Sequence, residues 1–271
     1  MAKSDKTRLD VYLVENHYFE SREKARIAIM EGKVYVNNQK EDKCGTLIKS
    51  DSSVVEYRGE QLKYVSRGGL KLEKAMNVFN ISFKDKVCVD IGSSTGGFTD
   101  LMIKNGASIV YAVDSGTNQL AYSLRTNDKV KVLENTNARY LSKEKLDNSD
   151  IDIITIDVSF ISLTKIIPIA NMILNNGGEA VMLIKPQFEA GREKVEKNGV
   201  IRDSKVHEEV IKKVINFCVS EGLSVFGLDY SPIKGPAGNI EFLLYVKKNN
   251  ASDSFDEKMI SDIVTKSHTE L

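Results

Sequence analysis

Three charged residues stand where apolar segments of the sequence begin or end. Asp157 and Lys185 each follow an apolar segment, and Glu241 directly precedes one. A lysine at the end of a buried strand costs free energy unless it is paired or reaches a cleft. A lysine held beside acids can take up a proton or balance a developing negative charge. Asp157 and Lys185 are therefore candidate site residues, whereas Glu241 could also be a solvated residue at a strand end.

A glycine-rich segment, residues 90–98, lies between a predicted strand and a predicted helix. Its spacing is Gly-x-x-x-Gly-Gly, which differs from the Gly-x-Gly-x-x-Gly of dinucleotide sites. Glycines in such a turn let a ligand approach the backbone closely. S-adenosylmethionine has no pyrophosphate, and its ammonium and carboxylate would suit Asp90 beside exposed backbone amides. A glycine turn that only packs is the alternative.

A second acid, Asp114, ends the next predicted strand. An acid there can accept hydrogen bonds from both ribose hydroxyls of an adenosine, and it serves NAD enzymes equally well. The pattern predicts a nucleoside-containing cofactor, and a nucleotide-dependent oxidoreductase stays an alternative. The candidate cofactor-binding residues are Asp90, Gly92, Ser94, Gly96, Gly97, Phe98, Asp114 and Asp157.

Strand-like and helix-like patterns alternate from about Lys86 onward, which predicts a mainly parallel sheet covered by helices. Seven strands are expected, at residues 87–90, 109–114, 130–133, 151–157, 180–184, 223–228 and 240–246. Helices are expected at residues 98–104, 119–125, 162–174 and 204–221. The expected fold class is α/β, a doubly wound, seven-stranded Rossmann-like sheet that binds its ligands at the carboxyl ends of the strands.

Residues 8–60 show a different pattern, two short helices followed by small strands. Ser21 is a suitable N-cap for the second helix, and Gly32 ends that helix. Residues 33–38 alternate apolar residues and finish with Asn-Asn, which predicts a hairpin. A small α+β domain is therefore expected before the large sheet.

The second short helix exposes basic residues. Arg22 and Arg26 share a face and could contact phosphates together, although nearby glutamates reduce the basic character. The strings that begin at Arg8, Ser21 and Gly32 are similar to the alpha-L RNA-binding module, which ribosomal and pseudouridine synthase proteins carry. The resemblance implies that Arg8, Arg22 and Arg26 bind RNA. Arg67 lies in a later basic stretch that either contacts RNA or is a solvated linker.

The chain as a whole resembles the TlyA family, often labelled hemolysin A, which joins an alpha-L module to an FtsJ-like ribose methyltransferase. The most specific strings lie at residues 65–72, 90–99, 157–162, 185–189 and 235–241. The resemblance implies S-adenosylmethionine as the cofactor and a cytidine ribose in ribosomal RNA as the acceptor, within one or both ribosomal subunits. It also implies a catalytic tetrad formed by Lys71, Asp157, Lys185 and Glu241.

The two patterns divide the chain into domains. Residues 1–63 are expected to form the RNA-binding domain with a short N-terminal arm, and residues 70–271 the methyltransferase domain. Residues 64–69 are expected to be an interdomain linker and a hinge, because they end in two glycines.

Composition limits the alternatives. The formal net charge is zero, so an RNA role must rest on local features. The apolar runs are too short for a membrane-spanning helix and the N-terminus has no signal-peptide core, so the cytoplasm is expected and a membrane-active hemolysin is disfavoured. Three cysteines without paired spacing and three separate histidines, His17 among them, predict no disulfide and no metal site. A monomer is favoured.

Overall fold

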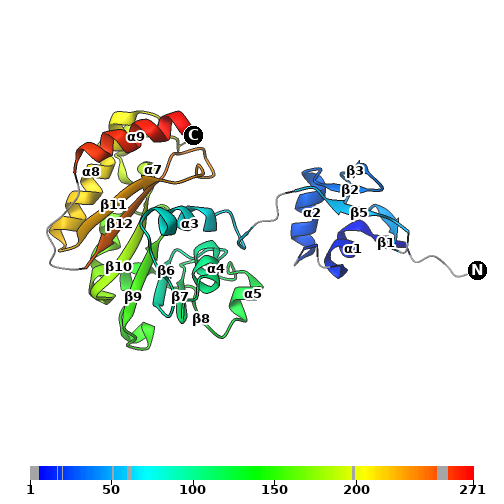
Figure 1. Cartoon of the computed structure of the whole chain (residues 1–271), viewed down its shortest axis with the longest axis horizontal. Helices are drawn as coiled ribbons and strands as arrows, with labels where there is room; N and C mark the ends of the chain where they lie inside the picture. The colour runs from blue at the N-terminus through cyan, green and yellow to red at the C-terminus, as the bar shows by residue number, and fades with distance from the viewer. Residues whose placement is uncertain are drawn as a thin grey trace, which may run out of the picture. The chain divides into compact units, whose positions relative to one another are not determined.

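The computed structural model describes residues 6–16, 18–19, 21–50, 52–59, 63–196, 199–248 and 256–271. His17, expected to be a surface or packing residue, lies outside these ranges. The chain splits into two compact units, Met1–Gln61 and Leu62–Leu271, whose elements are labelled in Figure 1. Each unit is described by itself.

The first unit has the two helices and the hairpin that its sequence predicts. Its elements are β1 (Lys6–Arg8), α1 (Leu9–Glu15), α2 (Arg22–Met30), β2 (Val34–Val36), β3 (Gln39–Glu41), β4 (Leu47–Lys49) and β5 (Val55–Tyr57). Ser21 Oγ accepts from Lys24 N at 3.3 Å, which caps α2. Asn37 and Asn38 adopt φ of 49° and 65°, so the β2–β3 turn uses the two residues that tolerate this conformation. The helices and strands enclose one small apolar core.

The second unit is built on a seven-stranded sheet with the strand order β11-β12-β10-β9-β6-β7-β8. The strands are β6 (Val87–Ile91), β7 (Ile109–Val113), β8 (Val130–Leu133), β9 (Ile151–Ile156), β10 (Leu174–Ile184), β11 (Ser224–Tyr230) and β12 (Phe242–Lys247). All seven correspond to expected strands. The sheet is mixed, because β12 runs antiparallel to both β10 and β11.

Helices cover both faces of this sheet, as the doubly wound prediction requires (Figure 1). One face carries α3 (Gly69–Val78) and α4 (Gly97–Lys104), and the other carries α6 (Ile167–Ile173), α8 (Ser204–Ser220) and α9 (Lys258–Glu270). Two short helices, α5 (Tyr122–Arg125) and α7 (Pro186–Glu189), lie between strands. Helices α3, α7 and α9 were not expected from the sequence.

The segment 64–69, expected to be a linker, belongs to the second unit. Its first residue, a tyrosine, is buried, and Val65 N donates to Asp100 Oδ2 at 2.9 Å. The glycines suggested a hinge, but they allow close packing instead. A Cβ on Gly97 would lie 2.7 Å from Gly69 N, so α3 and α4 meet where neither has a side chain.

Candidate functional site

Three of the four expected tetrad residues come from strand ends at one edge of the sheet. Asp157 follows β9 and Lys185 follows β10, and these two strands are parallel. Glu241 precedes β12, which is antiparallel to β10 with Ile184 opposite Phe242. A residue that opens β12 therefore lies beside one that ends β10.

The fourth residue, Lys71, comes from the first turn of α3. Its side chain is only 9% exposed, because α3 packs on the sheet. The close contact between Gly69 and Gly97 places the start of this helix beside the strand ends. The structure thus brings all four expected residues together.

The four side chains form a chain of alternating charges. Lys71 Nζ lies 2.6 Å from Glu241 Oε2 and 3.8 Å from Asp157 Oδ2. Lys185 Nζ lies 2.6 Å from Asp157 Oδ1 and donates to Ser159 Oγ at 3.0 Å. The contact with Oδ1 has the distance of an ion pair, yet no donor among the described residues meets hydrogen-bond geometry at this oxygen. Asp157 thus contacts both lysines, Lys185 through Oδ1 and Lys71 through Oδ2.

Glu241 is almost fully buried, at 1% exposure, which excludes the alternative of a solvated strand end. Burial raises the pKa of this carboxyl, and attraction to Lys71 and Lys185 opposes the shift. Gly235 leaves the space that this side chain occupies, since a Cβ there would lie 2.5 Å from Glu241 Oε1. The glycine and the glutamate of the string 235–241 therefore form one structural unit.

A pocket of about 160 Å³ lies at the glycine-rich loop. Its lining residues are Ser66, Gly68, Gly92, Ser93, Ser94, Thr95, Gly97, Phe98 and Asp157. Gly97 and Phe98 begin α4, so the first N–H groups of this helix lie at the pocket wall and favour a negatively charged group. Asp157 belongs both to this pocket and to the ion-pair chain.

Asp114 connects the glycine-rich loop to the loop that follows β7. Its Oδ2 accepts from Ser94 N at 2.8 Å, and its Oδ1 accepts from Gly116 N at 2.7 Å. Each carboxylate oxygen can accept a second hydrogen bond. The structure therefore holds this acid at the loop, although Asp114 is not among the residues that line the pocket.

Asp90, expected to face a ligand ammonium, is fully buried beneath the loop. Its Oδ2 accepts from Thr99 Oγ1 at 2.7 Å and its Oδ1 from Thr155 Oγ1 at 3.0 Å. Burial raises the pKa of Asp90 to about 6, and the two hydroxyl hydrogen bonds oppose this shift. The side chain connects β6 to α4 and β9 and is not among those that line the pocket.

Two loop glycines serve packing within the protein. Gly96 was expected to leave room for a ligand, but a Cβ there would lie 2.3 Å from Leu124 Cδ1, and Gly96 does not line the pocket. A Cβ at Gly92 would lie 2.5 Å from the backbone oxygen of Asp157. Both glycines have positive φ, 96° and 86°, which other residues rarely adopt. Gly92 thus lets β9 bring Asp157 against the loop.

Phe160 is an exposed aromatic residue near Asp157 that was not among the expected site residues. It lies three residues after Asp157, is 91% exposed and has a φ of 64°, which is strained for a bulky side chain. Its ring centroid lies 5.1 Å from that of Phe188. The signal in the sequence that could have identified Phe160 is its position, an aromatic residue directly after the polar residues that end a strand.

Glu189, the last residue of the string 185–189, bonds to the segment that follows Asp157 and not to the tetrad. Its Oε2 accepts from Ser162 Oγ and its Oε1 from Leu163 N, both at 2.6 Å. The segment after Lys185 is thereby tied to the segment after Asp157. These bonds fix the two loops that carry the Lys185–Asp157 ion pair.

Comparison with known proteins assigns both units. A model of the FtsJ-like methyltransferase matches residues 64–248, and a model of the S4 domain matches residues 7–54. The first match covers more than half of the chain. The chain belongs to the FtsJ-like methyltransferase family.

Relatives of this FtsJ-like chain match it over nearly its full length. YqxC, a proposed rRNA methyltransferase of Bacillus subtilis, is 49% identical over 99% of this chain and 96% of its own. TlyA of Mycobacterium tuberculosis H37Rv, named a 16S/23S rRNA (cytidine-2′-O)-methyltransferase, is 35% identical over 89% of this chain and 90% of its own. A solved Streptococcus thermophilus structure, whose name proposes a hemolysin, is 46% identical with a TM-score of 0.78, over 99% of this chain and 98% of that one.

The sequence pattern left a nucleotide-dependent oxidoreductase as an alternative. The family match identifies the larger unit as a methyltransferase instead. Within the described ranges, no helix is long and apolar enough to cross a membrane. The same part of the chain has no group of three or more histidine, cysteine or acidic side chains placed to hold a metal ion.

In the S4 domain, Arg8 and Arg22 converge on one buried acid, Asp10. Arg8 contacts both carboxylate oxygens at 3.0 Å, and Arg22 contacts Oδ2 at 2.8 Å. The hydrogen bond from Arg8 lowers the pKa of Asp10 to about 2 despite its burial. Arg26 is exposed one turn further along α2, and Arg67 is exposed in the FtsJ-like unit. Arg8 and Arg22 thus have a structural partner as well as exposed guanidinium groups.

Proposed function

We propose that this protein transfers a methyl group from S-adenosylmethionine to the 2′-hydroxyl of a cytidine in ribosomal RNA. One observation carries the proposal. Asp157 lines the loop pocket, and its two carboxylate oxygens hold Lys71 and Lys185. A donor in the pocket and an acceptor at the lysines would meet at this one carboxylate. Relatives named rRNA (cytidine-2′-O)-methyltransferases support the choice of acceptor.

The loop residues fit S-adenosylmethionine. The amides at the start of α4 suit its carboxylate, and Asp114 keeps acceptor positions for its ribose hydroxyls. The pocket volume of about 160 Å³ is below that of a typical complete small-molecule site, so it would hold part of the cofactor. Asp90 would act by holding the loop. When bound, the cofactor supplies an electrophilic methyl group.

Lys185 would handle the proton of the ribose hydroxyl. As the oxygen–methyl bond forms and the methyl–sulfur bond breaks, the hydroxyl must lose its proton. Lys185 can accept that proton as an amine; as an ammonium it can stabilise the developing alkoxide while the proton passes to water. Both roles need Nζ beside the hydroxyl. Asp157 orients Lys185, while Glu241 holds Lys71 as the second cation of the site.

The target nucleotide would be presented unstacked. Phe160 offers an exposed ring three residues after Asp157, and stacking of a base on an aromatic ring stabilises an extruded nucleotide. The S4 domain would hold the ribosomal RNA through Arg8, Arg22 and Arg26, and Arg67 of the FtsJ-like unit would contribute. The protein would act as a cytoplasmic monomer on one or both ribosomal subunits.

Mapping ribose methylation in ribosomal RNA tests this function. RNA from cells with and without the gene is compared nucleotide by nucleotide, and the gene with Lys185→Ala is returned as a control. The expected result is loss of the 2′-O-methyl group at one or two cytidines, restored by the unaltered gene alone. Identical maps in all strains would refute the proposal.

A further inference from the structure

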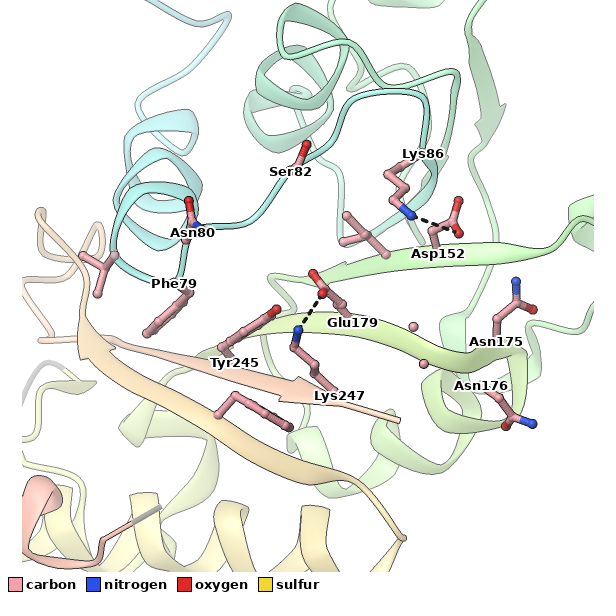
Figure 2. Close-up of a pocket in the computed structure, with 15 residues that line it drawn as sticks. Phe79, Asn80, Ser82, Lys86, Asp152, Asn175, Asn176, Glu179, Tyr245 and Lys247 are labelled. Carbon is pink, nitrogen blue, oxygen red and sulfur yellow. Dashed lines mark hydrogen bonds and ion pairs between the residues drawn. The ribbon is translucent and has the colours of Figure 1, made fainter. Parts of the chain in front are cut away.

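A second cavity, of about 720 Å³, lies in the FtsJ-like unit at the edge of the sheet opposite to the tetrad. The tetrad lies where β9 and β10 end, whereas this cavity is lined by the starts of β6, β9 and β10 and by the end of β12. Its volume is within the range of small-molecule sites. We call it the amino-edge groove and define it by Phe79, Asp152, Asn176, Glu179, Phe226 and Tyr245 (Figure 2).

A local irregularity in β10 creates the groove. Leu174 pairs with Ile151 and Glu179 pairs with Ile153, so four residues of β10 lie opposite a single residue of β9. These four residues have the sequence Asn-Asn-Gly-Gly, which packs little volume at the edge of the sheet. Such bulges are over-represented beside functional sites, where they redirect side chains.

One end of the groove is aromatic. The rings of Phe79 and Tyr245 are stacked, with centroids 5.3 Å apart and an interplanar angle of 10°, and they lie side by side in Figure 2. Phe226 meets Tyr245 edge-on at 6.3 Å and is 38% exposed. A Cβ on Gly227 would lie 2.5 Å from the Phe79 ring, so a glycine admits this ring. Lys247 Nζ lies over the Phe226 and Tyr245 rings, 5.2 and 5.4 Å from their centroids, so the exposed part of Phe226 is the ring surface on which a planar group can stack.

The rest of the groove is polar without net charge. Lys247 Nζ lies 2.9 Å from Glu179 Oε1, and Lys86 Nζ lies 3.6 Å from Asp152 Oδ1, both drawn as dashed contacts in Figure 2. A strand with many phosphates requires an excess of cations, which these balanced pairs do not supply. Carboxylates accept hydrogen bonds from ribose hydroxyls, and amides such as that of exposed Asn176 pair with base edges.

We propose that the amino-edge groove binds one unstacked nucleoside, with its base on the aromatic cluster and its ribose hydroxyls at Glu179 or Asp152. The nucleoside is either free or a single nucleotide extruded from an RNA strand, since both present the same base and ribose. This site is separate from the loop pocket, because the two share no lining residue. It goes beyond the proposed methyl transfer, which uses the other edge of the sheet.

The proposal can be tested by titrating the full chain with the riboside of 2-aminopurine. Stacking quenches the fluorescence of this base, so quenching measures binding. Saturating S-adenosylhomocysteine is present throughout to fill the loop pocket. We expect saturable quenching that Phe226→Ala weakens about tenfold, as for loss of one stacking partner. Tyr140→Ala, which removes a 68% exposed ring outside the groove, should leave the quenching unchanged. The absence of saturable quenching, or equal quenching by Phe226→Ala, would overturn the proposal.

Two further measurements distinguish a free nucleoside from an extruded nucleotide, and the groove proposal from the proposed methyl transfer. The same base within a short single-stranded RNA should show quenching that depends on Phe226 and should bind at least tenfold more tightly if the groove takes an extruded nucleotide. If the groove takes a free nucleoside, the quenching that depends on Phe226 should be no tighter than for the riboside; either result supports the nucleoside class. A photoreactive residue in place of Phe226 that crosslinks in ribosomal subunits to protein alone would contradict it. Failure of S-adenosylhomocysteine to bind would count against the proposed function, whereas Phe226-dependent quenching would still identify the groove.

Discussion

Lys185 Nζ lies 2.6 Å from Asp157 Oδ1, and Lys71 Nζ lies 3.8 Å from the other oxygen of that carboxylate, Oδ2. One acid thus separates two cations, and it also lines the loop pocket. Lys71 is occupied by Glu241 at 2.6 Å. Lys185 is therefore the amine whose position is set mainly by the acid shared with the pocket.

Replacing this amine should stop turnover without emptying the pocket. Lys185→Ala removes the group that handles the hydroxyl proton, and we expect kcat to fall about a hundredfold or more. Calorimetry should show unchanged S-adenosylmethionine affinity, because Lys185 does not line the pocket. Lys165→Ala, at an exposed lysine, is the matched control. Substantial turnover by Lys185→Ala would move the proton-handling role to another residue.

Phe160 should act on the RNA and not on the cofactor. Phe160→Gly removes the ring and relieves the strain of a φ of 64°, so it should leave the fold intact or slightly stabilised. We expect kcat/KM for ribosomal subunits to fall about tenfold, as expected when one base no longer stacks on a ring, with S-adenosylmethionine affinity unchanged. Phe160→Tyr should restore most of the activity. Equal activity of the glycine variant would show that the exposed ring has no part in presenting the target.

The difference between Lys185 and Lys71 shows what the sequence could predict. Lys185 and Asp157 follow buried strands, and the edge where parallel strands end is fixed once the strands are known. The position of Lys71 depends on α3, which packs through a contact between Gly69 and Gly97 far apart in sequence. No local pattern encodes that contact, so only family resemblance identified this lysine.

The same reasoning covers the loop. The glycine-rich turn followed from spacing and strand order and lines the loop pocket, whereas Asp114 bonds to Ser94 N of that turn without lining the pocket. The orientation of Asp90 did not follow, because two threonines from other elements hold its carboxylate away from the pocket. For Gly96, the neighbour that a side chain would meet is Leu124, which a one-dimensional pattern does not indicate.

Asp90 should make stability depend on pH. Burial raises its pKa from 3.8 to about 6, so the folded state keeps a proton that the unfolded state has released between these values. Stability from this group is present below about pH 4 and is lost as the pH rises to about 6. Relative to the wild type, Asp90→Asn should gain about 2 kcal/mol in free energy of unfolding between pH 4 and pH 7. Urea unfolding at the two pH values measures this, and a constant difference would show that Asp90 is not held protonated.

Arg26 offers the cleaner test of RNA binding by the S4 domain. Arg26→Ala should make the slope of log affinity against log salt shallower by about 0.7 to 0.9 for each phosphate that is no longer neutralised, with no change in melting temperature. Arg22→Ala should change both quantities, because it also removes a partner of buried Asp10. Filter binding across a salt series and thermal unfolding measure the two effects. An unaltered slope for Arg26→Ala would place the phosphate-binding groups elsewhere.

The identity of the atom that receives the methyl group is the central claim. A lysine at a strand end suits a hydroxyl, whose proton must be removed or whose alkoxide must be balanced, and this chain places Lys185 at the acid that lines the pocket. The direct measurement is methyl transfer to ribosomal RNA in which the target nucleotide alone carries a 2′-deoxyribose, with the natural nucleotide as control. We predict complete loss of transfer to the deoxy substrate. Methylation of that substrate would place the methyl group on the base and contradict the mechanism.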